Sequence, residues 1–247
     1  MRRSGRRPRA QAFSTVEAVV RSFCGPRARL ALSAAAVACG LTGPALSADA
    51  ASGVGRIENT NTGGGCTAAL IAPDLVVTAA HCGGRGETPD GIVFRPGDGR
   101  PGTYPVARVV RHPLYDRESP RVEWRLRFDL AVAVLETPVP GDRAVPFTTG
   151  DDARVGETLH LYSWREGSRP RQRPCPTLDG IPGLVTLGCR VQGGESGSPV
   201  LRVTDEGLEI VAVISSRGRI LDQPVAQASD VRLRLPPILD ILGRDRP

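Results

Sequence analysis

The sequence predicts an all-β protein built from short strands. Gly and Pro contribute 29 and 22 of the 247 residues, a share that favours many turns over long helices. Hydrophobic residues make up 40% of the chain and aromatic residues 4%, a balance that excludes a coiled coil, a disordered tail and a collagen-like fibre. From residue 64 onward, short apolar or alternating runs recur between turn signals, as in the strands of a barrel or a sandwich.

The chain begins with a basic segment that predicts an export signal. Its apolar run at 30–41 is too short to span a bilayer. Small residues at Ala48 and Ala50 fit a signal peptidase site, which places the mature start near Ala51, with cleavage after Ala48 as the alternative. We therefore expect a leader over residues 1–50 and a secreted chain, extracellular or periplasmic, without a stable membrane anchor.

The formal charge of +6 resides in this leader, which holds eight Arg against two acidic residues. The remaining 24 Arg and 24 acidic residues cancel. A neutral mature chain exerts no long-range attraction on phosphate or anionic lipid. We therefore expect no nucleic-acid partner.

The expected strands fall into two sets, because each set consists of apolar or alternating runs and a Pro-rich stretch separates them. The first set is 66–71, 75–78, 91–94, 106–110 and 130–136. The second set is 157–164, 183–191, 198–203 and 208–215. Near the end, residues 236–243 show helical spacing, with Pro at the start and Gly at the finish.

These sets predict the organisation of a single domain over residues 51–247. Its first half covers about 54–137 and its second half about 147–235. The stretch 138–146 is the linker between them, and the helix at 236–243 follows the second half.

Three segments carry residues with catalytic chemistry. His81 follows a strand in "VVTAAHC", and Asp129 precedes one in "RFDLAVAVLE". Ser196 lies in the Gly-rich "QGGESGSPV", where small neighbours leave backbone N–H groups free to point at a substrate oxygen. Each segment alone also fits a structural role: a loop histidine, a hydrogen-bonded buried acid and a Gly-rich hairpin.

Together and in this order, "TAAHC", "FDLAV" and "GESGSP" resemble the catalytic segments of the chymotrypsin-like (trypsin-like) serine proteases, with compact bacterial secreted members as the better comparison. The resemblance implies two packed six-stranded antiparallel β-barrels with a short C-terminal helix. It implies that His81 is the general base, that Asp129 orients it and that Ser196 is the nucleophile. The matching oxyanion donors are the N–H groups of Gly194 and Ser196.

The cysteines agree with a secreted chain. Removing Cys24 and Cys39 with the leader leaves four cysteines, an even number that predicts disulfides and allows three connectivities. The resemblance implies a bridge between Cys66 and Cys82. The second pair is then Cys175 with Cys189.

The resemblance is less specific for the substrate pocket. By counting, Arg190 falls at the pocket floor, and the segment Ser215, Ser216 and Arg217 resembles the strand that pairs with the substrate backbone. An Arg at the floor would favour an acidic residue before the scissile bond. The alternative is an Arg that points to solvent.

Among the departures from the family, two concern the nucleophile turn and activation. Glu195 stands before the nucleophile, where most relatives carry Asp. Arg56-Ile57 resembles the activation cleavage site of many animal members, but "IENT" follows where a small hydrophobic residue and two glycines are expected. An active form that starts at Ile57 and one that starts near Ala51 are therefore alternative predictions.

The sequence thus predicts a secreted serine endopeptidase that acts through an acyl-enzyme. The alternatives are an inactive protease-fold binding protein and an adhesion or structural β domain. The expected partner is a protein or peptide substrate, with a proteinaceous inhibitor as a further candidate, and the chain is expected to be a monomer. No zinc-ligand spacing or cofactor motif occurs, so we expect neither a metal nor a cofactor.

We expect structural roles for the other residues that stand out in the sequence. His112, in "VRHPLYD", matches a family segment where the histidine is structural. Four arginines mixed with Pro predict a solvated, flexible basic loop. They are Arg165, Arg169, Arg171 and Arg173.

Overall fold

The computed structural model describes residues 51–84, 89–164 and 170–245, which lie in one compact unit, Pro44–Pro247. The expected leader with its two cysteines lies outside the described residues, as do Arg165 and Arg169. None of the described helices is long and apolar enough to cross a membrane.

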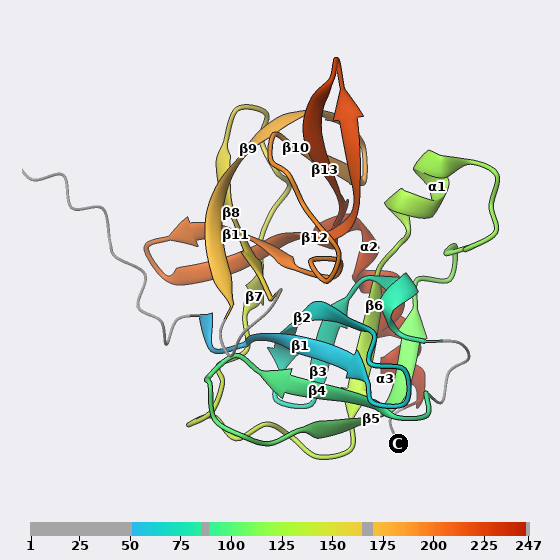
Figure 1. The fold of residues 1–247 in the computed structure, drawn as a ribbon, viewed down its shortest axis with the longest axis vertical. Coiled ribbons are helices and arrows are strands. Elements are labelled where there is room, and N and C mark those ends of the chain that lie inside the picture. The colour runs from blue at the N-terminus through green and yellow to red at the C-terminus, as the bar shows by residue number, and fades with distance from the viewer. Residues whose placement is uncertain (1–50, 85–88, 165–169, 246–247) are drawn as a thin grey trace, which may run out of the picture. The chain divides into compact units, whose positions relative to one another are not determined.

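The first half of the domain is a closed antiparallel barrel of six strands (Figure 1). In chain order, the strands are β1 (Val54–Asn59), β2 (Gly65–Ala72), β3 (Leu75–Thr78), β4 (Ile92–Pro96), β5 (Tyr104–Arg111) and β6 (Ala131–Leu135). Around the barrel their order is β1-β2-β3-β6-β5-β4, and pairing of β1 with β4 closes it.

The second half repeats this architecture. Its strands are β8 (Thr158–Ser163), β9 (Arg171–Ile181), β10 (Leu184–Leu187), β11 (Pro199–Thr204), β12 (Gly207–Ile220) and β13 (Gln223–Asp230). The order β11-β8-β9-β10-β13-β12 closes through β11 and β12, while the short β7 (Thr148–Thr149) adds to β12 in parallel. The predicted fold of two six-stranded barrels with a short C-terminal helix is confirmed.

The interior consists of one apolar cluster in each barrel and a third that joins them. In the first barrel, Phe94 and Ile57 are among the fully buried side chains. The joining cluster brings Leu75 and Val132 of the first barrel together with Val213 of the second. Burial of apolar surface therefore holds the two barrels against each other.

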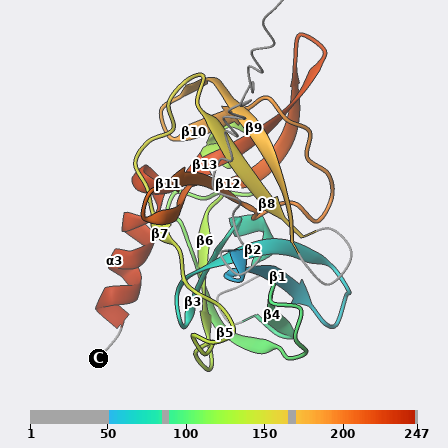
Figure 2. The ribbon, with the colours of Figure 1, turned by 90° about the vertical axis from the view of Figure 1, so that its left-hand side faces the viewer.

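Short helices occupy the connections and the C-terminus. They are η2 (Ala80–Cys82), α1 (Val122–Arg127), α2 (Val231–Arg234) and α3 (Pro236–Asp245). The predicted helix is α3, which contributes Ile238 and Leu242 to the joining cluster and flanks the barrels in Figure 2. Asp230 caps α2 by accepting a hydrogen bond from the Leu233 N–H at 3.0 Å.

Most expected strands are present, but β1, β7, β9 and β13 were not predicted, nor were α1 and α2. Strand β9 carries Pro174 and Pro176, and Pro argues against a central strand because it cannot donate to the ladder. The predicted loop was wrong for Arg171 and Arg173, which lie in β9 and pair with β8, whereas the expected exposure to solvent holds for Arg171. Arg173 also reaches a buried carboxylate, as described below.

Candidate active site

His81 and Asp129 form a tight pair in the first barrel. His81 lies in η2 directly after β3, and Asp129 lies in the segment between α1 and β6. The imidazole Nδ1 is 2.7 Å from the Asp129 Oδ2, and the His81 N–H donates to Oδ1 at 2.9 Å. An ionised carboxylate only accepts, so in the neutral imidazole Nδ1 carries the proton and Nε2 keeps a free lone pair.

Asp129 is buried and has a third donor from the second barrel. The Ser215 hydroxyl donates to Asp129 Oδ2 at 2.5 Å, and both side chains are almost inaccessible to solvent. A buried carboxylate is costly without such partners, and three donors offset that cost. Burial and then the charge of Asp129 raise the pKa of the nearby Tyr115 to about 12.

Ser196 lies in the turn before β11, and its main chain is anchored to the first barrel. The Thr67 N–H donates to the Ser196 carbonyl at 2.8 Å, and the Gly197 N–H donates to the Ile214 carbonyl at 2.7 Å. Gly197 has a φ of +78°, and a Cβ there would overlap the Thr67 carbonyl and the Thr78 hydroxyl. Only glycine fits this close approach of the two barrels.

The same turn presents two N–H groups for an oxyanion. Within the described part of the chain, the N–H groups of Gly194 and Ser196 donate no hydrogen bond, and both residues are partly exposed. Gly194 adopts a φ of +85°, which glycine reaches without strain. The described residues also hold no hydrogen bond from the Ser196 hydroxyl to His81, although such bonds often tighten only when substrate is bound.

The Thr67 side chain, from β2 of the first barrel, holds this turn and the end of β8 in the second barrel. Its hydroxyl lies 3.0 Å from the Gly194 carbonyl and accepts a hydrogen bond from the Trp164 N–H at 2.9 Å. Thr67 is fully buried. One side chain of β2 thereby fixes both the oxyanion turn and the end of β8.

Glu195, which precedes the nucleophile, is buried and fully partnered. Arg173 donates to both of its carboxylate oxygens at 2.8 and 2.9 Å, Ser163 donates at 2.6 Å, and the Gln192 N–H donates at 2.7 Å. Burial raises the pKa of Glu195, but these hydrogen bonds, led by that of Arg173, outweigh it, and the pKa is lowered overall. The carboxylate is therefore charged and holds the turn through the backbone of Gln192.

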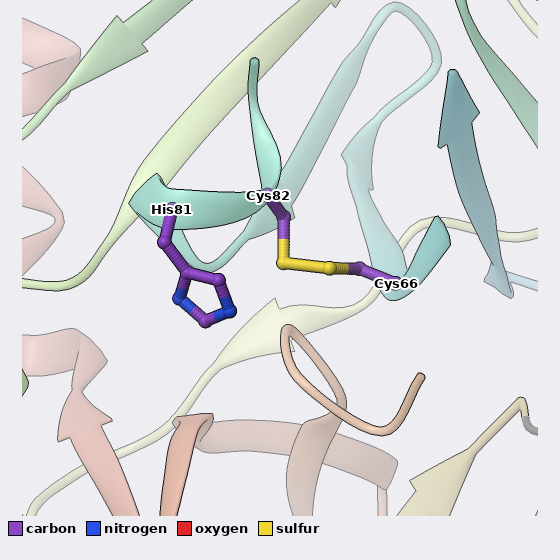
Figure 3. Close-up of side chains that lie close together, drawn as sticks. All are labelled: Cys66, His81 and Cys82. Atoms are coloured by element: carbon purple, nitrogen blue, oxygen red, sulfur yellow. A yellow bond between two sulfur atoms is a disulfide. The ribbon is translucent and has the colours of Figure 1, made fainter. Parts of the chain in front are cut away.

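Both predicted disulfides are present, as Cys66–Cys82 and Cys175–Cys189. The first lies beside His81 (Figure 3), with the two sulfurs and an imidazole nitrogen within 4.8 Å of one another. Cysteine binds metals as a thiolate, and both sulfurs are bonded to each other. This cluster therefore fits a metal ion poorly.

The predicted substrate-binding residues divide between two environments. Ser215 is committed to Asp129 and is buried. The Ser216 hydroxyl donates to the Arg217 carbonyl at 3.0 Å. Arg190 and Arg217 are exposed and line one cavity, from segments on either side of it.

Sequence reasoning missed Thr67, Ser163 and Arg173. A buried acid beside the nucleophile demands a cationic or hydrogen-bonding partner, so Glu195 itself was a signal to search for Arg173. Nothing in the sequence around Thr67 distinguishes it from an ordinary strand residue.

Comparison with known families adds a match to the family model described as Trypsin over residues 48–175, just over half of the chain. The matched segment includes His81 and Asp129 and ends before Ser196. No curated protein matches the chain.

Proposed function

Because the chain belongs to the trypsin family, we propose that it is a secreted serine endopeptidase with Ser196 as nucleophile, His81 as general base and Asp129 as the group that orients it. The observation that carries this proposal is the hydrogen-bonded pair of His81 and the buried Asp129, in which Nδ1 faces the carboxylate and Nε2 is the nitrogen available to accept a proton. An imidazole in this tautomer can take a proton from an alcohol near neutral pH.

In the proposed reaction, the Ser196 Oγ attacks the peptide carbonyl while its proton passes to His81 Nε2. The imidazolium then donates that proton to the leaving amine as the C–N bond breaks, which leaves an acyl-enzyme. Water attacks the ester, His81 accepts its proton and returns it to Ser196, and the acid product leaves. Asp129 stabilises the imidazolium in both halves of the cycle.

The oxyanion formed in each half is proposed to accept hydrogen bonds from the N–H groups of Gly194 and Ser196. Two observations support this role: both N–H groups lack a partner among the described residues, and Thr67 fixes the Gly194 carbonyl. Donors held in place before the reaction need no reorganisation as charge develops, and loss of one typically lowers kcat about 10²- to 10³-fold.

A fluorophosphonate probe tests the proposal, because it labels an activated serine covalently. We expect the mature protein to be labelled at Ser196 and Ser196→Ala to be unlabelled. Ser198→Ala, two residues away, is the matched control and should still be labelled. If folded mature protein remained unlabelled, the endopeptidase proposal would fail and a protease-fold binding protein would be the better description.

A further inference from the structure

A basic cavity is lined in part by Gln192, the first residue of the hydrogen-bonded turn that leads to Ser196. It has a volume of about 610 Å³ and is lined by Arg190 and Gln192 from the segment before Ser196, and by Arg217, Arg219 and Asp222 from β12 and the turn after it. Arg217 and Arg219 are two residues apart in β12, so their side chains leave the same face of the strand. Three arginines therefore line a space that is large enough for a side chain.

The positive charge of this cavity is largely uncompensated. Arg219 lies 3.8 Å from the Asp222 carboxylate, an ion pair whose acid side chain is 98% exposed and which is therefore weak. Arg190 and Arg217 pair with no carboxylate in the described part of the chain. The cavity thus carries a net positive charge, although the mature chain as a whole is neutral.

The cavity is connected to the nucleophile turn by rigid contacts. The Glu195 N–H donates to the Gln192 carbonyl at 3.2 Å, which folds the chain between the cavity wall and Ser196 into a single turn. Arg173 donates to the Arg190 carbonyl at 2.9 Å as well as to Glu195. On the opposite wall, β12 runs from Ser215, the partner of Asp129, directly to Arg217.

From this placement we propose that the cavity receives a carboxylate side chain, Glu or Asp, of the residue that supplies the scissile carbonyl. The proposal rests on the proposed endopeptidase function. Guanidinium groups bind carboxylates through charge-assisted hydrogen bonds, often bidentate. A lysine or arginine side chain in the same place would face three like charges.

Acetylated peptide coumarin amides that differ only in the residue before the coumarin test this proposal. We expect kcat/KM for Glu to exceed that for its isostere Gln by about tenfold, with Lys below Gln. Because these substrates carry no terminal carboxylate, such a preference comes from the side chain. A preference for Lys, Arg or large apolar residues over Glu would overturn the proposal.

Substitutions of the cavity arginines test whether these residues cause the preference for Glu over Gln. Arg190→Gln and Arg217→Gln should each reduce the ratio of kcat/KM for Glu over Gln several-fold, and the double variant should abolish it. Arg121→Gln removes an exposed arginine outside the cavity and should leave the ratio unchanged. An unchanged ratio in the double variant, with thermal unfolding like that of the wild type, would overturn the assignment.

A free C-terminal carboxylate is the other source of the same chemistry. Peptides with Gln at the tested position and either a free or an amidated C-terminus separate the two sources. Hydrolysis that requires the free terminus would overturn the side-chain proposal. Fluorophosphonate labelling is measured on the same samples, so that failure of the specificity proposal with intact labelling is distinct from failure of the proposed enzyme.

Discussion

At the scale of single residues, Thr67 is the position where a small change should separate catalysis from substrate binding. Thr67→Val keeps the shape of the side chain but removes the hydroxyl that lies 3.0 Å from the Gly194 carbonyl. Because this bond positions the oxyanion turn and touches no substrate, we expect kcat to fall about tenfold with little change in KM. Steady-state kinetics on one peptide substrate, measured well below the unfolding temperature, checks this.

The matched variant at this position is Thr67→Ser, which restores the hydroxyl and should return kcat to near the wild-type value. Thr67→Val also leaves the Trp164 N–H without its acceptor, so we expect a loss of about 1–3 kcal/mol in the free energy of unfolding. A valine variant that lost stability but kept its kcat would mean that Thr67 supports the fold and not the oxyanion turn.

The burial of His112 leads us to expect that the free energy of unfolding depends on pH, separately from any effect of pH on catalysis. It is buried, it packs on Phe128 with ring centroids 4.8 Å apart, and its Nδ1 accepts from the Leu114 N–H at 3.1 Å. Burial and then the charge of Arg234 lower the pKa of His112 to about 4. Below pH 6.5 the unfolded chain therefore binds a proton that the folded chain excludes, and the folded state loses stability as the pH falls toward 4.

The variant that tests this is His112→Asn, whose side-chain oxygen can still accept from a backbone N–H two residues ahead. It should be less stable than the wild type at pH 7, because it loses the contact with Phe128. Between pH 6.5 and 4 the gap should narrow by up to about 3 kcal/mol. Chemical denaturation at several pH values measures the gap, and a constant gap would contradict the prediction.

At the scale of elements, the ion pair between Arg173 of β9 and Glu195 fixes the nucleophile turn. Glu195 has a lowered pKa, so the stability it contributes is complete above the ordinary glutamate pKa of about 4.3 and is lost as the pH falls through the folded value. Arg173→Met should reverse this dependence. Burial would then be opposed only by weaker partners, the pKa of Glu195 would rise, and acidification would stabilise the variant relative to the wild type.

The double variant Arg173→Met with Glu195→Gln removes the buried charge altogether and serves as the control. It should be more stable at pH 7 than Arg173→Met, because removing one partner of a buried pair costs about 3–5 kcal/mol and leaves an uncompensated charge. Thermal or chemical unfolding at pH 4 and pH 7 measures both effects. Equal stability of the single and double variants at pH 7 would show that Glu195 does not need its cation.

Strands β3 and β9 show which elements the sequence predicts and which it does not. The predicted run "LVVT" has the same bounds as β3. Its four side chains are all buried, so the apolar run in the sequence marks the strand. Strand β9 has buried positions at Cys175 and Thr177, but Pro176 lies between them and the run Arg-Gln-Arg-Pro precedes them, so no apolar alternation marks it. The motifs predicted the residues of the candidate site, whereas the bonds made by Thr67 and Arg173 depend on contacts between distant strands, which a local pattern does not contain.

At the scale of the whole molecule, the candidate site exists only where the two barrels meet. His81 and Asp129 come from the first barrel, and Ser196 and Ser215 come from the second. The Cys66–Cys82 disulfide closes a short loop in the first barrel, and Cys175–Cys189 closes one in the second, each worth about 3 kcal/mol in a chain-entropy account. Neither bridge crosses the interface, where apolar packing, hydrogen bonds and the contact of Arg234 with the Phe128 ring hold the two halves together.

The fold of the first barrel favours one of the two predicted mature starts. The Arg56–Ile57 bond lies within β1, where Ile57 pairs with Cys66 on β2 and with Phe94 on β4. Proteases cut exposed segments, and cleavage here would require opening the barrel on both sides of β1. Glu195 already has Arg173 as its cation, so the nucleophile turn needs no new chain terminus to hold it.

We therefore expect the active secreted form to start near Ala51 with the Arg56–Ile57 bond intact, as N-terminal sequencing and intact mass of fluorophosphonate-labelled protein would show. Arg56→Gln removes the basic residue from this bond and should leave the rate of labelling within about twofold, because Glu58, the partner that it loses, keeps its ion pair with Arg95 at 2.9 Å. A labelled form that starts at Ile57, together with loss of labelling in Arg56→Gln, would instead make cleavage in β1 the activating step. The paired strand would then have to open before Ser196 could react.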